Sequence, residues 1–181
     1  MNKLFSLTII MLLAFSLFVG CTNADKLKPT TEEEPSSVLT QSEKQQIEKE
    51  ISDVSKTFFQ LAEKLNIDSC MTFFENTKDF LAANSDGTSG DYNSVKKANS
   101  ELFSQIKSFT SNLKKESIRI LSKSQVLYTF FAYQTCTHKT GDTMTLDNVA
   151  LTMLFTKINN SWKVTYIHES SLPPVIGGTK K

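Results

Sequence analysis

The chain has 181 residues, of which 39% are hydrophobic and 22% charged, and its formal net charge is +1. Lysine and arginine number 20 against 19 acidic residues, and Arg119 is the only arginine. Clustered positive charge and bidentate arginine contacts dominate the recognition of nucleic-acid phosphates, so nucleic acid is excluded as an expected partner.

Residues 1–20 have the pattern of an export signal. A single early lysine in "MNK" precedes the apolar run "LFSLTIIMLLAFSLFVG", which is short for a membrane-spanning helix and ends in small residues. We predict a signal peptide that is removed on export. The remaining chain is then formally neutral, because Lys3 is lost and no acidic residue is lost with it.

Cys21 follows this signal directly. The stretch "FVGC" resembles a bacterial lipobox, whose cysteine is lipidated and becomes the first residue, although Phe18 stands where leucine is usual. The resemblance implies a lipoprotein of the bacterial cell envelope, held on a membrane by its N-terminal lipid. Thr22 lacks the acidic side chain that retains such proteins at an inner membrane, which favours the outer membrane or cell surface. A plain cleaved signal with a chance cysteine is the alternative.

Three segments are expected after the signal peptide. Residues 21–41, which include Cys21, are polar, carry two prolines and the run "EEE", and predict a flexible tether. Residues 42–172 are long enough for one domain with its own core. Residues 173–181 are predicted to form a C-terminal tail.

The first half of the domain has helical periodicity. Its opening helix has an apolar stripe at steps of four and three, formed by Ile47, Ile51, Val54, Phe58, Leu61 and Leu65. Ser42 and Gln45 are predicted to form its capping box. A short second helix after "NID" is expected to carry Cys70, and a third helix to begin near Ser94. Between these two helices, "DFLAANSDGTSGD" predicts a strand that runs into a loop.

From about Phe109 the apolar period changes to two. Strands are predicted around Ile118 and Ile120, over "QVLYTFFAYQTCTH", over "LDNVALTMLFTK" and over "WKVTYIHE". In the last strand, Trp162, Val164, Tyr166 and His168 are expected to share one face. Helices followed by antiparallel strands predict an α+β fold in which the helices pack on one side of a curved antiparallel sheet.

This order of elements, together with the final "WKVTYIHESS", resembles the nuclear transport factor 2-like superfamily and its SnoaL-like members. The resemblance implies a cone-shaped, cystatin-like fold that encloses a mostly apolar pocket. It leaves the activity open, because the superfamily includes isomerases, dehydratases, epoxide hydrolases, ligand binders and oligomerisation modules.

Catalysis would require an acid and a base in that pocket. The resemblance implies an acid near a Tyr, His or Arg, for which Asp147, with Arg119 as a cationic partner, is the candidate. His168 is the candidate base or proton donor, since imidazole titrates near neutrality, and Glu169 is among its potential partners. Because the residues form no compelling triad, a structural role for His168 on the closing strand is favoured.

The candidate ligand-binding residues are Tyr128, Tyr133, Tyr166 and His168. Cys70 and Cys136 are expected to be buried free thiols, with a disulfide as the alternative that an exported location permits. The two histidines and two spare cysteines are not at ligand spacing, so no metal and no cofactor are expected.

These observations favour a noncatalytic domain that binds a small apolar or amphipathic ligand, or a protein partner. An isomerase, dehydratase or hydrolase that uses Asp147 and His168 is the alternative. A dimerisation module that pairs through the outer sheet face is a third hypothesis, with a homodimer as its product. An acid and a histidine in one cavity would favour the enzyme, and a filled cone would favour the dimerisation module.

Overall fold

The computed structural model describes residues 38–177, in which three helices precede or interrupt a seven-stranded sheet. The predicted signal peptide, Cys21 and most of the predicted tether lie outside these residues. The helices are α1 (Gln41–Glu63), α2 (Ile67–Met71) and α3 (Tyr92–Gln105). The strands are β1 (Leu81–Ala83), β2 (Ser89–Gly90), β3 (Ile106–Ser122), β4 (Gln125–His138), β5 (Thr143–Ile158), β6 (Ser161–Ser171) and β7 (Val175–Gly177).

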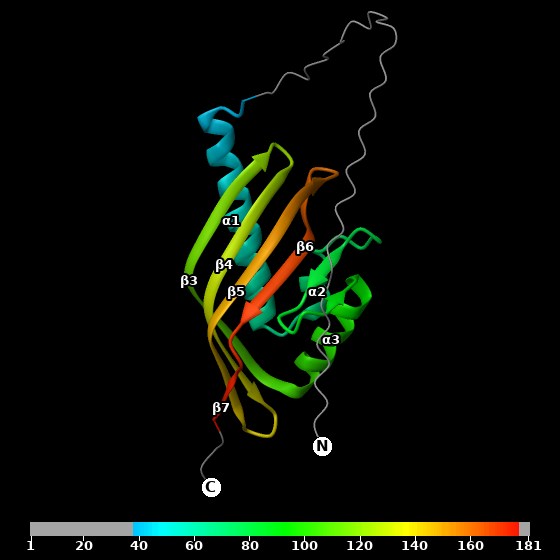
Figure 1. The fold of residues 1–181 in the computed structure, drawn as a ribbon, viewed down its shortest axis with the longest axis vertical. Coiled ribbons are helices and arrows are strands. Elements are labelled where there is room, and N and C mark those ends of the chain that lie inside the picture. Colours follow the sequence, from blue (N-terminus) through cyan, green and yellow to red (C-terminus); the bar gives the residue numbers. More distant parts are fainter. Residues whose placement is uncertain (1–37, 178–181) are drawn as a thin grey trace, which may run out of the picture. The chain divides into compact units, whose positions relative to one another are not determined.

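The curved sheet has the order β2-β1-β6-β5-β4-β3, with β7 paired to β5 (Figure 1). The predicted α+β class is confirmed, but the sheet is mixed because β1 runs parallel to β6. Asn159 and Asn160 form the two-residue loop between β5 and β6, and both have positive φ, at 48° and 61°. Asparagine tolerates this backbone region, which a tight hairpin turn requires.

Helix α1 lies lengthwise against the concave face of the sheet (Figure 1). Ile47 and Ile51 of the predicted stripe are buried, and Val54 and Phe58 pack against the core that they join. The predicted capping box was displaced by two residues, because Thr40 rather than Ser42 precedes the helix. The Thr40 hydroxyl accepts from the Glu43 backbone N–H at 3.2 Å, and the Glu43 carboxylate accepts from the Thr40 N–H at 2.8 Å.

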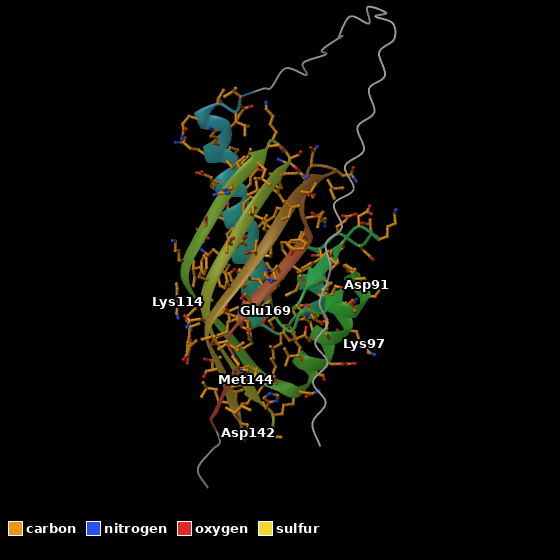
Figure 2. The ribbon with its side chains drawn as sticks, in the orientation of Figure 1. Asp91, Lys97, Lys114, Asp142, Met144 and Glu169 are labelled. Atoms are coloured by element: carbon orange, nitrogen blue, oxygen red, sulfur yellow. The ribbon has the colours of Figure 1, made fainter. Side chains whose placement is uncertain are left out.

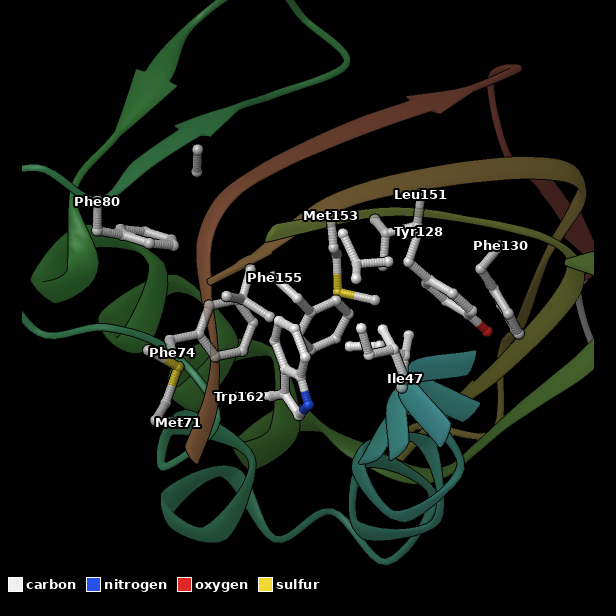
Figure 3. Close-up of a cluster of buried hydrophobic side chains, with 14 of the residues drawn as sticks. Ile47, Met71, Phe74, Phe80, Tyr128, Phe130, Leu151, Met153, Phe155 and Trp162 are labelled. Carbon is white, nitrogen blue, oxygen red and sulfur yellow. The ribbon is translucent and has the colours of Figure 1, made fainter. Parts of the chain in front are cut away.

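The core lies between α1 and the inner face of the long strands (Figure 3). Alternate residues of β4 and β5 point inward, so that Tyr128, Met153 and Phe155 are at most 1% exposed. The rings of Tyr128 and Phe155 meet edge to face with centroids 6.2 Å apart. This alternation agrees with the period of two in the sequence.

A cluster around Glu50 joins α1 to the β5–β6 hairpin. The Trp162 indole N–H donates to Glu50 Oε2 at 2.7 Å, and Lys157 Nζ lies 3.0 Å from the same oxygen. Gln46 Nε2 donates to Glu50 Oε1 at 3.0 Å. These hydrogen bonds, led by that from Gln46, lower the pKa of Glu50 to about 2.

One irregularity of register in β6 and one in β5 decide which later or earlier side chains of these strands face inward. Phe155 pairs with Val164 and Leu154 pairs with Tyr166, so Thr165 is an extra residue in β6. A β-bulge of this kind moves every later side chain to the opposite face. The expectation that Tyr166 and His168 share a face with Trp162 and Val164 was therefore wrong.

A second irregularity separates the pairs Ala132–Val149 and Gln134–Leu146. One residue of β4 is here opposite two residues of β5, Asp147 and Asn148. Both are exposed, and Lys114 Nζ donates to the Asp147 carbonyl and to Asn148 Oδ1.

Residues 173–177 of the predicted C-terminal tail lie within the described part of the chain, and residues 178–181 lie outside it. Val175 to Gly177 form β7, which pairs antiparallel with the start of β5, although the domain was predicted to end at residue 172. Residues 38–177 belong to one compact unit with its own core, so they are expected to fold without the residues that precede them.

Candidate functional site

A cavity of about 510 Å³, partly open to solvent, lies between the sheet and the three helices. The C-terminal end of α1, the inner residues of α2 and the inner face of α3 form one side. The β1–β2 hairpin and the inward residues of β3 to β6 form the other side. The lining is mostly apolar, with phenylalanine rings from α1, the segment after α2, α3 and β3.

Helix α3 forms a wall of this cavity rather than a layer packed on the sheet. Asp91 caps its start by accepting from the Ser94 backbone N–H at 2.8 Å. The apolar face of the helix, with Val95, Ala98 and Leu102, lines the cavity, and no residue of α3 is buried. An amphipathic helix normally packs such a face against the core, whereas in α3 this face borders the cavity.

Glu169 is the only acidic side chain that lines the cavity among residues 38–177. It lies in the C-terminal part of β6 (Figure 2), where it pairs with Leu151 of β5. Its side chain faces inward because the bulge at Thr165 turns the odd-numbered residues that follow it in β6 toward the cavity. Burial raises the pKa of its carboxyl, and no hydrogen bond or ion pair from the described part of the chain opposes this effect. A carboxyl in such surroundings is a strong candidate for a ligand-binding or proton-transferring group.

The lining amides are largely engaged by neighbouring groups. Asn99 Nδ2 donates to the Val95 carbonyl at 2.9 Å, Gln134 Nε2 to Ser111 Oγ at 3.1 Å, and Asn84 Nδ2 to Thr88 Oγ1 at 2.9 Å. Their nitrogen atoms are thus held within the protein. The carboxylate of Glu169 has no hydrogen-bond partner among the described residues, and it is the only lining group there that can carry a negative charge near neutral pH.

Cys70 and Cys136 both line the cavity, from α2 and β4, and both are buried free thiols, as expected. The Cys70 thiol lies 3.9 Å from the Phe58 carbonyl oxygen. Burial raises the pKa of Cys70 to about 11 and also raises the pKa of Cys136. Neither thiol is therefore activated as a nucleophile near neutral pH.

The predicted catalytic residues are not in this cavity. His168 is exposed on the outer face of the sheet, between Ala83 of β1 and Thr152 of β5. Asp147 is exposed in the β5 bulge, and Arg119 is exposed on β3. The structure thus separates Asp147 and His168 from the cavity, and it places Glu169, predicted only as a partner of His168, inside.

The predicted ligand-binding tyrosines also lie elsewhere. Tyr128 is buried in the core, where its hydroxyl donates to Glu116 Oε2 at 3.0 Å, and burial raises its pKa. Tyr133 and Tyr166 are half-buried and, like their partners Asn112 and Leu154, do not line the cavity. Their roles stay predictions, but the cavity does not depend on them.

No group of three His, Cys, Asp or Glu side chains within residues 38–177 is placed to hold a metal ion. Over the same residues, none of the helices combines the length and apolarity that a membrane span needs.

Helices on the concave face of a curved sheet, with a cavity between them, define a cone-shaped α+β domain of the cystatin-like class. The sequence profile of the SnoaL-like domain matches residues 51–175, and the chain belongs to this family. No significant match was found among curated proteins.

Solved structures of similar fold include several proteins of low identity. A candidate scytalone dehydratase from Novosphingobium aromaticivorans has a TM-score of 0.69 and 8% identity, over 78% of this chain and 94% of that one. Hexachlorocyclohexane dehydrochlorinase LinA-type3 from Novosphingobium barchaimii has a TM-score of 0.64 and 8% identity, over 77% and 96%. A protein with a cystatin-like fold from Caulobacter vibrioides has a TM-score of 0.59 and 15% identity, over 70% and 89%. At these identities the similarity establishes the fold alone.

Proposed function

We propose that this domain binds a small amphipathic molecule, with the apolar part of the guest in the cavity and its polar group at Glu169. The observation that carries the proposal is the cavity itself, about 510 Å³ of mostly apolar space in which Glu169 is the one carboxyl, unpaired within residues 38–177. Small-molecule sites in proteins typically have this size and this composition.

Burial of apolar surface would supply the affinity. An apolar guest that loses about 200 Å² of exposed surface gains about 5 kcal/mol before the costs of association are subtracted. A polar group on the guest that meets Glu169 would then fix its orientation. The space is too large for a filled cone, which weighs against a domain that serves only to dimerise.

The proposal can be tested with residues 37–181. Native mass spectrometry of this segment purified from its host should reveal a retained small molecule. Titration with the neutral apolar dye Nile red should show saturable binding that Ala98→Phe, which fills the cavity from α3, weakens at least tenfold. Asn93→Phe, at a position of the same helix that does not line the cavity, serves as the control. Equal dye affinity of the two variants would contradict binding in this cavity.

An enzyme that transfers protons is the second candidate. Its support is the unpaired carboxyl of Glu169, which can accept or donate a proton inside an apolar site. Similar folds also include a dehydrochlorinase and a candidate dehydratase. The cavity lining contributed by residues 38–177 has no histidine, tyrosine, lysine or arginine to act with Glu169, which favours binding over catalysis. Turnover of any substrate that Glu169→Gln abolishes without loss of affinity would establish the enzyme.

For the whole chain, we propose an exported lipoprotein that carries this domain on a tether. The support is the apolar run of residues 1–20 and its junction with Cys21. Metabolic labelling with a radioactive fatty acid should mark the wild-type protein, and Cys21→Ala should abolish both the label and membrane fractionation. A labelled Cys21→Ala variant would contradict the proposal.

A further inference from the structure

The groups that line the cavity have a chemical preference among amphipathic guests. Five phenylalanines, Phe58, Phe59, Phe74, Phe103 and Phe109, supply aromatic rings, and Glu169 supplies the negative charge. Aromatic faces attract organic cations, and a carboxylate pairs with an ammonium group through charge-assisted hydrogen bonds. This combination differs from a purely apolar pocket, which would take neutral guests of any kind.

We propose that the guest is a hydrophobic amine, whose ammonium group binds the carboxylate of Glu169 while its apolar body lies among the phenylalanine rings. This inference rests on the proposed function and specifies its ligand class.

The position of Glu169 supports an ion pair with a guest. Its carboxyl faces the cavity from β6, with Leu151 opposite it on β5 and Ile167 two residues earlier on the same face. These neighbours are apolar and cannot stabilise the ionised form. Burial accordingly raises the pKa of this carboxyl, and an ammonium group would reverse that effect by supplying the missing charge partner.

The same geometry opposes an acidic guest. A fatty acid or another carboxylate would bring a second negative charge beside Glu169 in surroundings of low dielectric constant, where like charges repel strongly. Within the described residues, the lining offers no lysine, arginine or histidine to offset that repulsion. A neutral alcohol of the same shape would keep the apolar contacts and lose only the ion pair.

Three probes of matched shape separate these cases: phenylbutylamine, phenylbutanol and phenylbutyrate. Their affinities for residues 37–181 are measured by NMR titration at about pH 8, where the amine is protonated. The amine should bind about tenfold more tightly than the alcohol, and the carboxylate more weakly than either.

The substitution Glu169→Gln keeps the shape of the side chain and removes its charge. It should weaken amine binding about tenfold and change alcohol binding by less than about twofold. Glu101→Gln, which removes an exposed carboxylate from α3 outside the cavity lining, should change neither. If Glu169→Gln does not fold, carbon NMR of the wild-type Glu169 carboxyl replaces it, and the amine should lower the pH at which this resonance titrates.

The outcomes distinguish this inference from the proposed function. Equal or tighter binding of the alcohol or the carboxylate overturns the amine preference and leaves a binding cavity in place. Amine binding that is insensitive to Glu169→Gln, or a Glu169 resonance that the amine does not shift, also overturns it. Failure of all three probes to bind, together with equal Nile red affinities of Ala98→Phe and Asn93→Phe, overturns both.

Discussion

Glu50 should contribute measurably to stability, because it holds α1 to the β5–β6 hairpin. Replacing it with glutamine keeps the volume and an oxygen for the Trp162 indole N–H, but removes the charge that pairs with Lys157 at 3.0 Å. A fall in pKa from 4.5 to about 2 corresponds to at most about 3 kcal/mol. Because the Glu50 side chain is still 30% exposed, solvent screening reduces the expected loss to about 1–2 kcal/mol.

The pH dependence of this loss follows from the direction of the pKa change. The folded protein binds the Glu50 proton more weakly than the unfolded chain does. Its contribution is therefore complete above a pH of about 4.5 and is lost as the pH falls toward about 2. The difference in unfolding free energy between wild type and Glu50→Gln should shrink over this interval.

Urea denaturation measures both effects, with the fluorescence of Trp162, the only tryptophan, as the signal. Glu48→Gln is the matched control, because it removes an exposed carboxylate from the same helix. The reasoning fails if Glu50→Gln costs no more than Glu48→Gln, or if the difference from wild type is constant between about pH 5 and pH 2.

Three further outcomes are expected, each with its own measurement. Thr40→Ala should lower the free energy of unfolding by about 1 kcal/mol in urea titrations, while Ser42→Ala stays within about 0.5 kcal/mol; the reverse order would contradict the observed cap. Phe155→Ala should lower the free energy of unfolding by about 3–5 kcal/mol in the same assay, because the ring is 1% exposed. A loss below about 1 kcal/mol would contradict its place in the core. Iodoacetamide at about pH 8 should modify Cys70 slowly in the folded protein and quickly in urea, because the raised pKa of the folded-state thiol suppresses the thiolate. The rates are measured by mass spectrometry, and equal rates in the two states would contradict the burial of Cys70.

The sequence contained enough information to predict the class of fold and the faces of most elements. The stripe led by Ile47 and Ile51 and the alternation from Val149 to Phe155 are strong periodic signals, and these positions contribute to the observed core. Turn residues such as Asn159 and Asn160 marked the hairpin between the last two long strands. Periodicity works in these places because each element is regular over many residues.

The cavity lining could not be predicted in the same way, because the two irregularities of register interrupt the alternation. Counting by twos from Trp162 reaches His168, whereas the extra residue at Thr165 brings Glu169 inward. The irregularity opposite Tyr133 likewise separates the exposed Asp147 from Val149, which is buried. "WKVTYIHE" has no glycine or other residue that marks a bulge, so only the pairing of strands reveals it. The residue inserted in β6 therefore places Glu169 in the cavity instead of His168, and the irregularity in β5 leaves Asp147 outside it.

The apolar face of α3 borders the cavity, so a bound guest would complete the packing between this helix and the sheet. Elements with few buried residues open locally at low free energy, so the amide hydrogens of α3 should exchange with solvent sooner than those of β4 and β5. Occupancy would close that gap and slow the exchange along Val95, Ala98 and Leu102. The helix would thereby convert the presence of a small molecule into a change in order at the protein surface.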